Sequence, residues 1–151
     1  MKYEEMNKDL FSVDNTYHLA HCISADYALG AGIAVEFNKR FDMKRKLNIK
    51  VPNCWKFMKS HNIDGFCIVV DNVLNLVTKE RYWHKPTYKS IEDALISMRR
   101  ACRAYGIKKV AMPAIGCGLD RLQWYKVSSI IKKVFKDEDI EILVCVFVEC
   151  H

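Results

Sequence analysis

A strand, a tight turn and a helix follow one another in Met112-Pro113-Ala114-Ile115-Gly116-Cys117-Gly118-Leu119-Asp120-Arg121-Leu122-Gln123-Trp124. Gly116 and Gly118 bracket the turn, and a backbone without a Cβ can adopt the left-handed or tight conformations in which several N–H groups converge on one anion. The positive end of the following helix would face the same spot. Because two glycines one residue apart also occur in ordinary strand-to-helix turns, the motif alone leaves both an anion site and a plain turn open.

A second glycine loop lies earlier in the chain. Residues 16–23 are predicted to form a buried strand, because β-branched, aromatic and small apolar residues dominate them. The strand leads towards Gly30-Ala31-Gly32, and the apolar residues beyond recur at helical spacing, in Ile33, Ala34, Phe37 and Phe41. His21 is interpreted as a core histidine satisfied by the backbone, since it has no partner at metal-ligand spacing. The second loop favours a binding site over a chance turn.

Other elements are predicted around these loops. Residues 1–13 indicate a short first strand, and the charged stretch 42–62 indicates one or two short helices with loops. A hairpin is predicted from strands 66–70 and 73–77, because Asp71-Asn72 between them is a pair that tolerates positive φ in tight turns.

The second half of the chain reads as helix, strand, helix and strand. Ser90, with Asp93 three residues on, indicates the N-cap of a helix that ends at Gly106. A strand at 107–115 then enters the central glycine loop. The helix beyond the loop has its core face in Val127, Ile130, Ile131, Val134 and Phe135. The last strand is predicted at 140–148, and the alternation of elements predicts an α/β fold.

Length and composition indicate a single domain over residues 1–151. Half of the residues are apolar and only three are proline, which permits a sizeable core. No apolar run reaches transmembrane length, and Met1-Lys2-Tyr3-Glu4-Glu5 lacks the apolar core of a signal peptide. We therefore expect a cytoplasmic protein that does not bind membranes. The net charge of +6 suits a phosphate-bearing ligand, weak attraction to nucleic acid or a merely basic surface, and the densest basic patch, 39–50, is interpreted as a solvated face.

The seven cysteines are an odd number and include no C-x-x-C pair. Disulfide frameworks usually show even counts in loop-rich chains, so reduced thiols are expected, and metal-ligand spacing is absent. Cys67 and Cys145 lie in apolar runs and are interpreted as core residues. Cys117 could be a nucleophile, but no histidine lies near it in the sequence to activate it.

Two charged residues each allow two interpretations. Lys79 ends the second hairpin strand, where open α/β sheets tend to place ligand chemistry, although a lysine at a strand end is more often simply solvated. Asp120 stands three residues before Gln123, the spacing of a capping box that contributes about 1 kcal/mol. Asp120 could instead act as a general acid or base beside a phosphate-binding loop. From the residues alone the helix cap is favoured.

Taken together, these features resemble the macrodomain family. The resemblance is carried by Ala20-His21-Cys22-Ile23-Ser24, Gly30-Ala31-Gly32-Ile33-Ala34-Val35, Thr78-Lys79, His84-Lys85-Pro86-Thr87-Tyr88 and, most specifically, Met112 to Trp124. It covers nearly the whole chain, is poor at about 42–64, and points to the branch called terminal ADP-ribose protein glycohydrolase or O-acyl-ADP-ribose deacylase. It implies a three-layer α/β/α macrodomain with a mixed sheet of about six strands that binds ADP-ribose across the strand ends, with no cofactor or metal.

The resemblance also implies catalytic roles. Lys79 would be the nucleophile that attacks the anomeric carbon of the distal ribose and gives a covalent lysyl adduct. Asp120 would be the general acid/base that helps open the bond and then resolves the adduct. An amine attacks only when it is unprotonated, so this role needs its proton to be removed. Main-chain N–H groups of the two loops would cradle the diphosphate and distal ribose, at Gly30, Gly32, Ile33, Ala34, Ala114, Ile115, Gly116, Cys117, Gly118 and Leu119.

At the adenine end the resemblance implies contacts from Asp9 and Leu10, with Phe147 as an aromatic wall, and Ser24 is implied as a further ligand contact. One position departs from the pattern of the branch. The glycine that usually precedes the adenine-side aspartate is Lys8 here, which puts close backbone approach to the adenine in question.

The expected activity is that of an ADP-ribosyl hydrolase that cleaves ADP-ribose from glutamate and aspartate esters and from O-acyl-ADP-ribose, including O-acetyl-ADP-ribose. Three alternatives stay open: an ADP-ribose 1''-phosphate phosphatase, a non-catalytic ADP-ribose reader, and a hydrolase of ADP-ribosylated nucleic acid bases. The last would suit the basic charge and would lose turnover on DNA as salt rises. The expected partners are ADP-ribose and ADP-ribosylated proteins, with ADP-ribosylated DNA as a further candidate, and the chain is expected to be a monomer.

Overall fold

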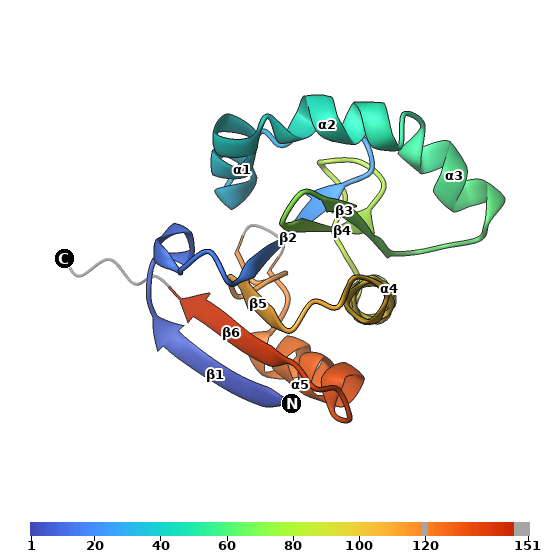
Figure 1. Ribbon diagram of the computed structural model, residues 1–151. Coiled ribbons are helices and arrows are strands. Elements are labelled where there is room, and N and C mark those ends of the chain that lie inside the picture. The colour runs from blue at the N-terminus through green and yellow to red at the C-terminus, as the bar shows by residue number, and fades with distance from the viewer. Residues whose placement is uncertain (119–120, 147–151) are drawn as a thin grey trace.

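The protein is built on one mixed six-stranded sheet with helices on both faces (Figure 1). The computed structural model describes residues 1–118 and 121–146. The strands are β1 (Lys2–Asn7), β2 (His18–Ser24), β3 (Phe66–Val70), β4 (Val73–Lys79), β5 (Lys109–Met112) and β6 (Glu141–Val146). The helices are α1 (Ile33–Phe41), α2 (Met43–Lys50), α3 (Cys54–Ser60), α4 (Tyr88–Tyr105) and α5 (Trp124–Phe135), with a 3-10 turn at Leu10–Ser12. The strand order is β1-β6-β5-β2-β4-β3, and all neighbours are parallel except the β3–β4 hairpin.

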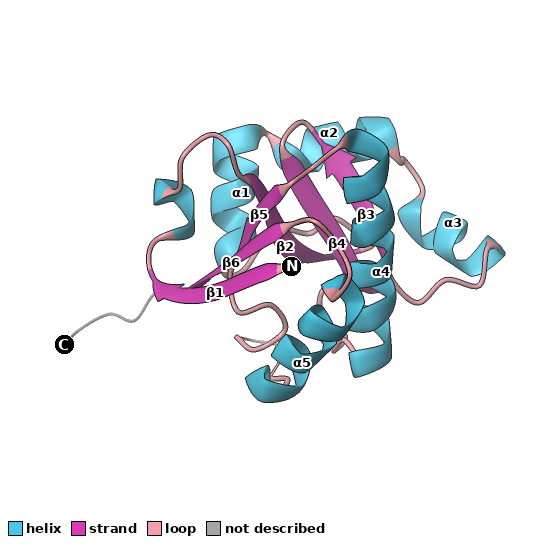
Figure 2. Ribbon diagram, turned by 60° about the horizontal axis from the view of Figure 1, so that its bottom comes forward, coloured by secondary structure: helices cyan, strands magenta, loops and turns pink. Residues whose placement is uncertain are grey.

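Each face of the sheet has its own hydrophobic core. Helices α4 and α5 cover one face, and α1, α2 and α3 cover the other (Figures 1 and 2). Strand β2 contributes to both, because side chains alternate along a strand. Ala20 and Cys22 pack in the α4–α5 core, whereas Leu19 and Ile23 pack in the α1–α3 core. This is the predicted three-layer α/β/α architecture.

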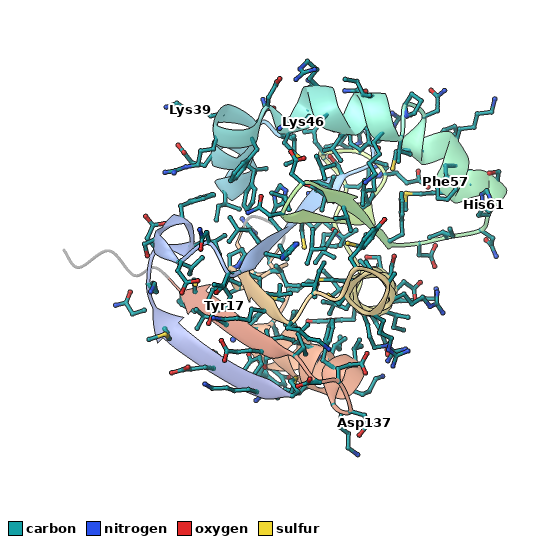
Figure 3. The ribbon with its side chains drawn as sticks, viewed as in Figure 1. Tyr17, Lys39, Lys46, Phe57, His61 and Asp137 are labelled. Carbon is teal, nitrogen blue, oxygen red and sulfur yellow. The ribbon has the colours of Figure 1, made fainter. Side chains whose placement is uncertain are left out.

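Several predicted elements are confirmed in place. The two hairpin strands are paired across Asp71-Asn72, and Asp71 has the positive φ, 51°, that the pair was expected to tolerate. The 42–62 stretch forms two short helices, α2 and α3. Within the basic patch, Lys39 extends away from the body of the molecule (Figure 3) and Lys46 pairs with Asp71 at 2.9 Å, which agrees with a solvated face.

The start of the longest helix differs from the prediction. Helix α4 begins at Tyr88, and its N-cap is Thr87 rather than Ser90. Thr87 Oγ1 accepts from Ser90 N–H at 3.0 Å, and Ser90 Oγ accepts from Thr87 N–H at 2.9 Å. Thr87 and Ser90 thus form the capping box that the sequence placed one turn later, and a serine replaces the usual glutamate at its third helical position. The helix ends before Gly106 (φ 65°), as predicted.

The elements around the central glycine loop are shorter than predicted. Strand β5 ends at Met112 and not at residue 115, and α5 begins at Trp124. Gln123 occupies the N-cap position of α5 and makes no side-chain cap hydrogen bond. The prediction of a helix cap at Asp120 is therefore wrong, because the helix starts four residues after it. The last strand is described as far as Val146, so the predicted residues 147–148 lie outside the described chain.

His21 is a fully buried core residue, as predicted, but its partner is a side chain. Asn75 Oδ1 accepts a hydrogen bond from His21 Nε2 at 2.7 Å, and the imidazole stacks on Phe37 with ring centroids 3.8 Å apart. The prediction that the backbone satisfies this histidine is wrong. Burial lowers the pKa of His21 to about 4, so the ring is neutral at pH 7.

The structure also shows the state of the cysteines and whether metal-ligand groups or membrane-spanning helices are present. Cys145 is buried and Cys67 is partly buried against the α4–α5 core. The six cysteines of the described chain are all free thiols. Over residues 1–118 and 121–146, no three His, Cys, Asp or Glu side chains gather as a metal site. No helix in those residues combines the length and apolarity that a membrane span requires.

Candidate active site

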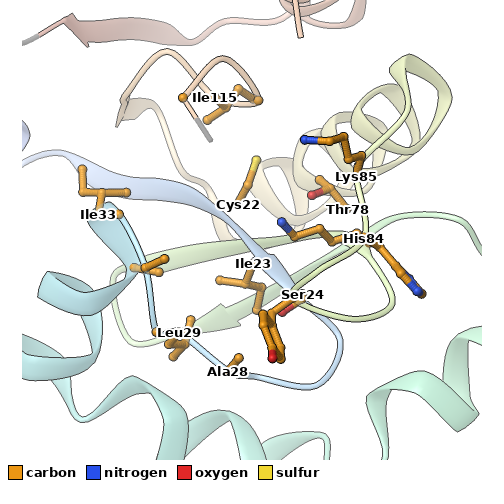
Figure 4. Close-up of a pocket in the computed structure, with 18 of the residues that line it drawn as sticks. Cys22, Ile23, Ser24, Ala28, Leu29, Ile33, Thr78, His84, Lys85 and Ile115 are labelled. Carbon is orange, nitrogen blue, oxygen red and sulfur yellow. The ribbon is translucent and has the colours of Figure 1, made fainter. Parts of the chain in front are cut away.

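A cavity of about 650 Å³ opens at the carboxyl ends of β2, β4 and β5 (Figure 4). These strands are parallel neighbours, so their ends meet at one edge of the sheet, where open α/β sheets bind ligands. The volume lies within the range of small-molecule pockets. The lining residues are 22–24, 28–34, 78–79, 82–85, 113–116 and 118.

The first glycine loop forms one wall of this cavity. Its predicted ligand residues Gly30, Gly32, Ile33 and Ala34 all line the cavity. Gly32 is the N-cap of α1, with φ 60° and ψ −148°, and no side chain caps the helix. Val35 N–H donates to Gly32 O at 3.3 Å, but the N–H groups of the first two helical residues have no acceptor within the helix. This end of α1 therefore offers uncapped donors and partial positive charge to an anion.

The second glycine loop forms the opposite wall. Ala114, Ile115, Gly116 and Gly118 line the cavity. Gly116 has φ 76°, and a Cβ there would lie 3.1 Å from Leu122 Cδ1. The turn is closed by its own hydrogen bonds, since Leu122 N–H donates to Gly116 O at 2.7 Å.

Of the other two predicted residues of this loop, Cys117 does not line the cavity and Leu119 lies outside the described residues. Cys117 is half-buried and is not among the cavity-lining residues. Burial raises the pKa of the Cys117 thiol, the opposite of what an activated nucleophile needs.

Lys79, the predicted nucleophile, ends β4 and lines the cavity. Its carbonyl oxygen accepts from Ala25 N–H at 2.9 Å, and it is paired with Ser24 at a register shift between β2 and β4. These contacts fix the backbone of Lys79 at the cavity wall, with its side chain half-buried. Asp120, the predicted acid/base, lies outside the described residues.

Thr78 adds a polar group that sequence analysis did not single out as a ligand contact. It lines the cavity, is only 1% exposed, and its Oγ1 has no hydrogen-bond partner within the described structure. Buried hydroxyls normally have a partner. A ligand oxygen in the cavity would supply one.

Asp26 is a positioning residue that sequence analysis missed. Its carboxylate accepts from Ser24 Oγ at 2.5 Å, from Ala28 N–H at 3.1 Å and from Tyr82 N–H at 2.9 Å. Burial raises the pKa of Asp26, but these hydrogen bonds and the charge of Arg81 outweigh burial, so the pKa is lowered overall and the group stays ionised at neutral pH. One carboxylate therefore joins the first glycine loop to the segment after β4. The local signal was Ser24-x-Asp26, a spacing at which aspartate makes local turns.

The residues predicted at the adenine end are not in the cavity lining. Asp9 caps the 3-10 turn, where its Oδ1 accepts from Phe11 N–H at 3.0 Å. Leu10 is buried in the α1–α3 core. Phe147 lies outside the described residues. Ser24, the other predicted ligand contact, does line the cavity.

An aromatic rim, made of Tyr82, Trp83 and His84, borders the cavity on the segment after β4. All three residues line it, and the Tyr82 and Trp83 side chains are 63% and 64% exposed. The Tyr82 and Trp83 rings meet edge to face at 5.0 Å, as do those of Trp83 and His84 at 5.4 Å. Three consecutive ring-bearing residues just after Lys79 were the sequence signal for this rim.

The sequence of residues 20–131 matches the Macro domain. ADP-ribose glycohydrolase OARD1 of Homo sapiens is 41% identical to this chain over 140 residues, which are 90% of this chain and 86% of that protein. The protein of the same name from Bos taurus shows the same identity and coverage.

Solved structures agree with this match. The macrodomain of Mycobacterium tuberculosis DarG aligns over 97% of this chain and 98% of that chain, with a TM-score of 0.77 and 23% identity. Thermosipho africanus DarTG in complex with ADP-ribose aligns over 94% of this chain and 40% of that chain, with a TM-score of 0.66 and 20% identity. At sequence identities of 20–23%, these structures are evidence for the fold only and not for the function. Since the sequence match spans most of the chain and its three-layer fold and strand-end cavity agree with it, the protein belongs to the macrodomain family.

Proposed function

We propose that this protein is an ADP-ribosyl hydrolase that uses Lys79 to release ADP-ribose from glutamate and aspartate esters and from O-acyl-ADP-ribose. The hydrolase class is supported by relatives named ADP-ribose glycohydrolase that are 41% identical over most of the chain. The observation that carries the chemistry is that Lys79 lines the same cavity as both glycine loops. An amine is thereby held beside two sets of main-chain donors suited to phosphate.

The geometry suggests how the substrate lies. The uncapped N-terminus of α1 suits the diphosphate, because donors and helix dipole both favour an anion there. The distal ribose then lies between the second glycine loop and Lys79. Thr78 Oγ1 and Ser24, on the ends of adjacent strands, are the polar groups next to Lys79 on the cavity wall.

The reaction proceeds in two displacements. The unprotonated Lys79 amine attacks the anomeric carbon of the distal ribose, a C–N bond forms, and the C–O bond to the acceptor carboxylate breaks with its electron pair leaving on oxygen. The nitrogen loses a proton to a base, the role proposed for Asp120. Water then attacks the same carbon, the C–N bond breaks, and Asp120 returns the proton to the amine. The attacking water loses its proton to solvent, so the net reaction is ester plus water giving ADP-ribose, a carboxylate and one proton.

The test is release of ADP-ribose from a glutamate-ADP-ribosylated protein and from O-acetyl-ADP-ribose. Wild type is compared with Lys79→Ala, Asp120→Ala and the matched control Lys44→Ala, an exposed lysine of α2. ADP-ribose binding is measured in parallel. We expect turnover by wild type and control, its loss in the other two variants, and retained binding by Lys79→Ala.

Three other outcomes would contradict the proposal. Tight binding with no turnover by wild type would identify a reader. Phosphate release from ADP-ribose 1''-phosphate, with no lysine adduct detectable by mass spectrometry, would identify a phosphatase. Turnover confined to ADP-ribosylated oligonucleotides, and lost as salt rises, would identify a nucleic acid base hydrolase.

A further inference from the structure

We propose that Tyr82 and Trp83, together with Lys85, form a subsite for the polypeptide that flanks an ADP-ribosylated glutamate or aspartate, and that this subsite favours acidic flanks. The inference rests on the proposed function, because it assigns the part of the substrate beyond the bond that Lys79 would cleave. It concerns the choice of acceptor and not the binding of ADP-ribose.

The position of the aromatic rim points to the acceptor. Tyr82 and Trp83 follow Lys79 by three and four residues and line the same cavity. The glycine loops occupy the other walls, so ADP-ribose that lies against them directs its distal ribose to Lys79. The group leaving from the anomeric carbon must extend away from those loops, and the segment that begins after Lys79 borders that side, where His84 and Lys85 also lie (Figure 4).

The exposure of the rim indicates that a partner covers it. Both large rings remain more than 60% exposed although they lie at the mouth of a cavity. Tryptophan and tyrosine are the side chains that most often carry binding energy at protein interfaces, because they bury a large area at small entropic cost. Covering both rings with a substrate would remove a contiguous apolar surface from water.

The ring geometry favours a polypeptide over a nucleic acid. Stacking of successive bases requires ring faces that are open in succession. Here the planes of Tyr82 and Trp83 stand at 87°, and those of Trp83 and His84 at 75°. The edge of one ring meets the face of the next. The rings therefore form an uneven apolar surface, which suits the side chains and peptide planes of an extended polypeptide.

Charge favours acidic flanks. Lys85 is exposed and lines the cavity beside the rings. Arg81, which precedes the rim in the chain, lies with its guanidinium 5.5 Å from the centre of the Trp55 ring and acts on the Asp26 carboxylate, so Lys85 is the cation of the subsite. The Lys85 cation beside this aromatic surface attracts acidic side chains and disfavours basic ones.

The backbone of the rim is also fixed before a partner arrives. Tyr82 N–H donates to the Asp26 carboxylate at 2.9 Å, and His84 N–H donates to Arg81 O at 3.0 Å. A backbone that is already held in place loses little conformational entropy on binding. The subsite is therefore able to contribute to affinity without first folding around its partner.

The experiment compares a long acceptor with a short one. The substrates are a peptide ADP-ribosylated on one glutamate with aspartate and glutamate flanks, the same peptide with serine flanks, and O-acetyl-ADP-ribose, whose acceptor ends just beyond the cleaved bond. The proteins are wild type, Trp83→Ala, Tyr82→Ala, Lys85→Gln and the matched control Tyr105→Ala, which removes an equally exposed ring at the far end of α4 (66% exposed).

We expect Trp83→Ala and Tyr82→Ala to lower kcat/KM on the acidic peptide by about tenfold or more, as expected of interface hot spots, and on O-acetyl-ADP-ribose by less than about threefold. Lys85→Gln should lower the ratio of kcat/KM on the acidic peptide to kcat/KM on the serine-flanked peptide. Tyr105→Ala should match wild type on every substrate.

Equal losses on peptide and O-acetyl-ADP-ribose would overturn the inference, because the rim would then belong to the ADP-ribose cradle. Undiminished peptide cleavage by the double variant Tyr82→Ala/Trp83→Ala would also overturn it. A larger loss on a base-ADP-ribosylated single-stranded oligonucleotide than on the peptide would reassign the rim to nucleic acid. If wild type cleaves none of the esters, the proposed function itself fails, which is a different result from an intact enzyme with an unimportant rim.

Discussion

The two glycine loops look alike in sequence but differ in structure. The first, at Gly30-Ala31-Gly32, leads directly into α1, and Gly32 is itself the uncapped N-cap. The second, at Gly116-Cys117-Gly118, is separated from α5 by several residues and folds back on itself through Leu122 N–H to Gly116 O. The same G-x-G pattern therefore yields a helix N-terminus in one wall of the cavity and a closed turn in the other.

The difference indicates that the two loops contribute to ligand binding in different ways. An uncapped helix end supplies fixed partial charge, which suits the diphosphate. A closed turn also supplies shape, because Cys117 N–H and Leu122 N–H donate to acceptors within it while the glycines face the cavity. The four predictions below test this contrast, from the largest expected effect to the smallest.

The first prediction concerns the support beneath the first loop, where His21 stacks on Phe37 of α1. The pKa of His21 is about 4 in the folded protein against an ordinary value of 6.5. Between these pH values the unfolded chain binds more protons, so the free energy of unfolding falls as the pH falls from about 6.5 to about 4, by up to about 3 kcal/mol. Urea unfolding at pH 7.0 and at a pH of about 4.5 measures the loss.

The matched variant for this prediction is His21→Gln, which cannot take up the proton. The half-buried His18 also has a pKa lowered by burial, so it acts in the same direction in both proteins and cancels in the comparison. A loss of stability of the same size in wild type and His21→Gln would contradict the role assigned to His21.

The second prediction concerns Gly32. Its φ of 60° with ψ of −148° is a conformation that is open almost only to glycine. Gly32→Ala should cost about 2 kcal/mol of unfolding free energy and, because it disturbs the donors at the start of α1, should weaken ADP-ribose binding as well. Thermal unfolding and calorimetric titration with ADP-ribose measure the two effects. An unchanged affinity of Gly32→Ala for ADP-ribose would contradict the assignment of this loop to the diphosphate.

The third prediction concerns Gly116 in the closed turn. Gly116→Ala must keep φ at 76° and brings a Cβ to 3.1 Å from Leu122 Cδ1. We expect a loss of about 1 to 2 kcal/mol of unfolding free energy, most of it from the left-handed backbone, since the tip of a leucine side chain can shift. Chemical denaturation measures it. Retained stability would show that the turn opens more readily than its hydrogen bonds suggest.

The fourth prediction concerns Gly118, which has no positive φ and nothing within 4 Å of an added Cβ. Gly118→Ala should change the unfolding free energy by less than about 0.5 kcal/mol. The same denaturation experiment serves as the internal control for Gly116→Ala. A loss as large as that of Gly116→Ala would show that both glycines are required for the turn.

The fold was largely predictable because local signals agreed with the global pattern. The hairpin was placed to the residue by Asp71-Asn72, and the amphipathic helix ending at Gly106 was recognised from its spacing. The boundaries failed where side-chain chemistry was ambiguous. Ser90 is a good cap residue, but the cap lies at Thr87, and no periodicity signal separates the two because both precede the same apolar face.

The sequence predicted the loops that form the cavity walls, but it did not predict the tertiary hydrogen bonds that hold those loops in place. The glycine loops are recognised in the sequence by the spacing of their glycines, and Lys79 is recognised by its position at the end of a predicted strand. The carboxylate of Asp26 joins Ala28 to Tyr82, 54 residues apart in the chain, and such a contact depends on tertiary structure. The buried pair of His21 and Asn75 is also separated by 54 residues, so the sequence alone could not name the partner.

The hydrogen bond between Tyr82 and Asp26 comes from the main chain of Tyr82 and not from its phenol. Any residue except proline could make it, so the identity of the side chains at 82 and 83 is free to vary while the anchor is kept. Under the proposed assignment of the rim to the acceptor, acceptor choice and nucleotide binding are modular in this architecture. Exchange of two side chains on a fixed backbone segment offers a direct route to redirect the enzyme from one class of modified protein to another, with the ADP-ribose cradle left untouched.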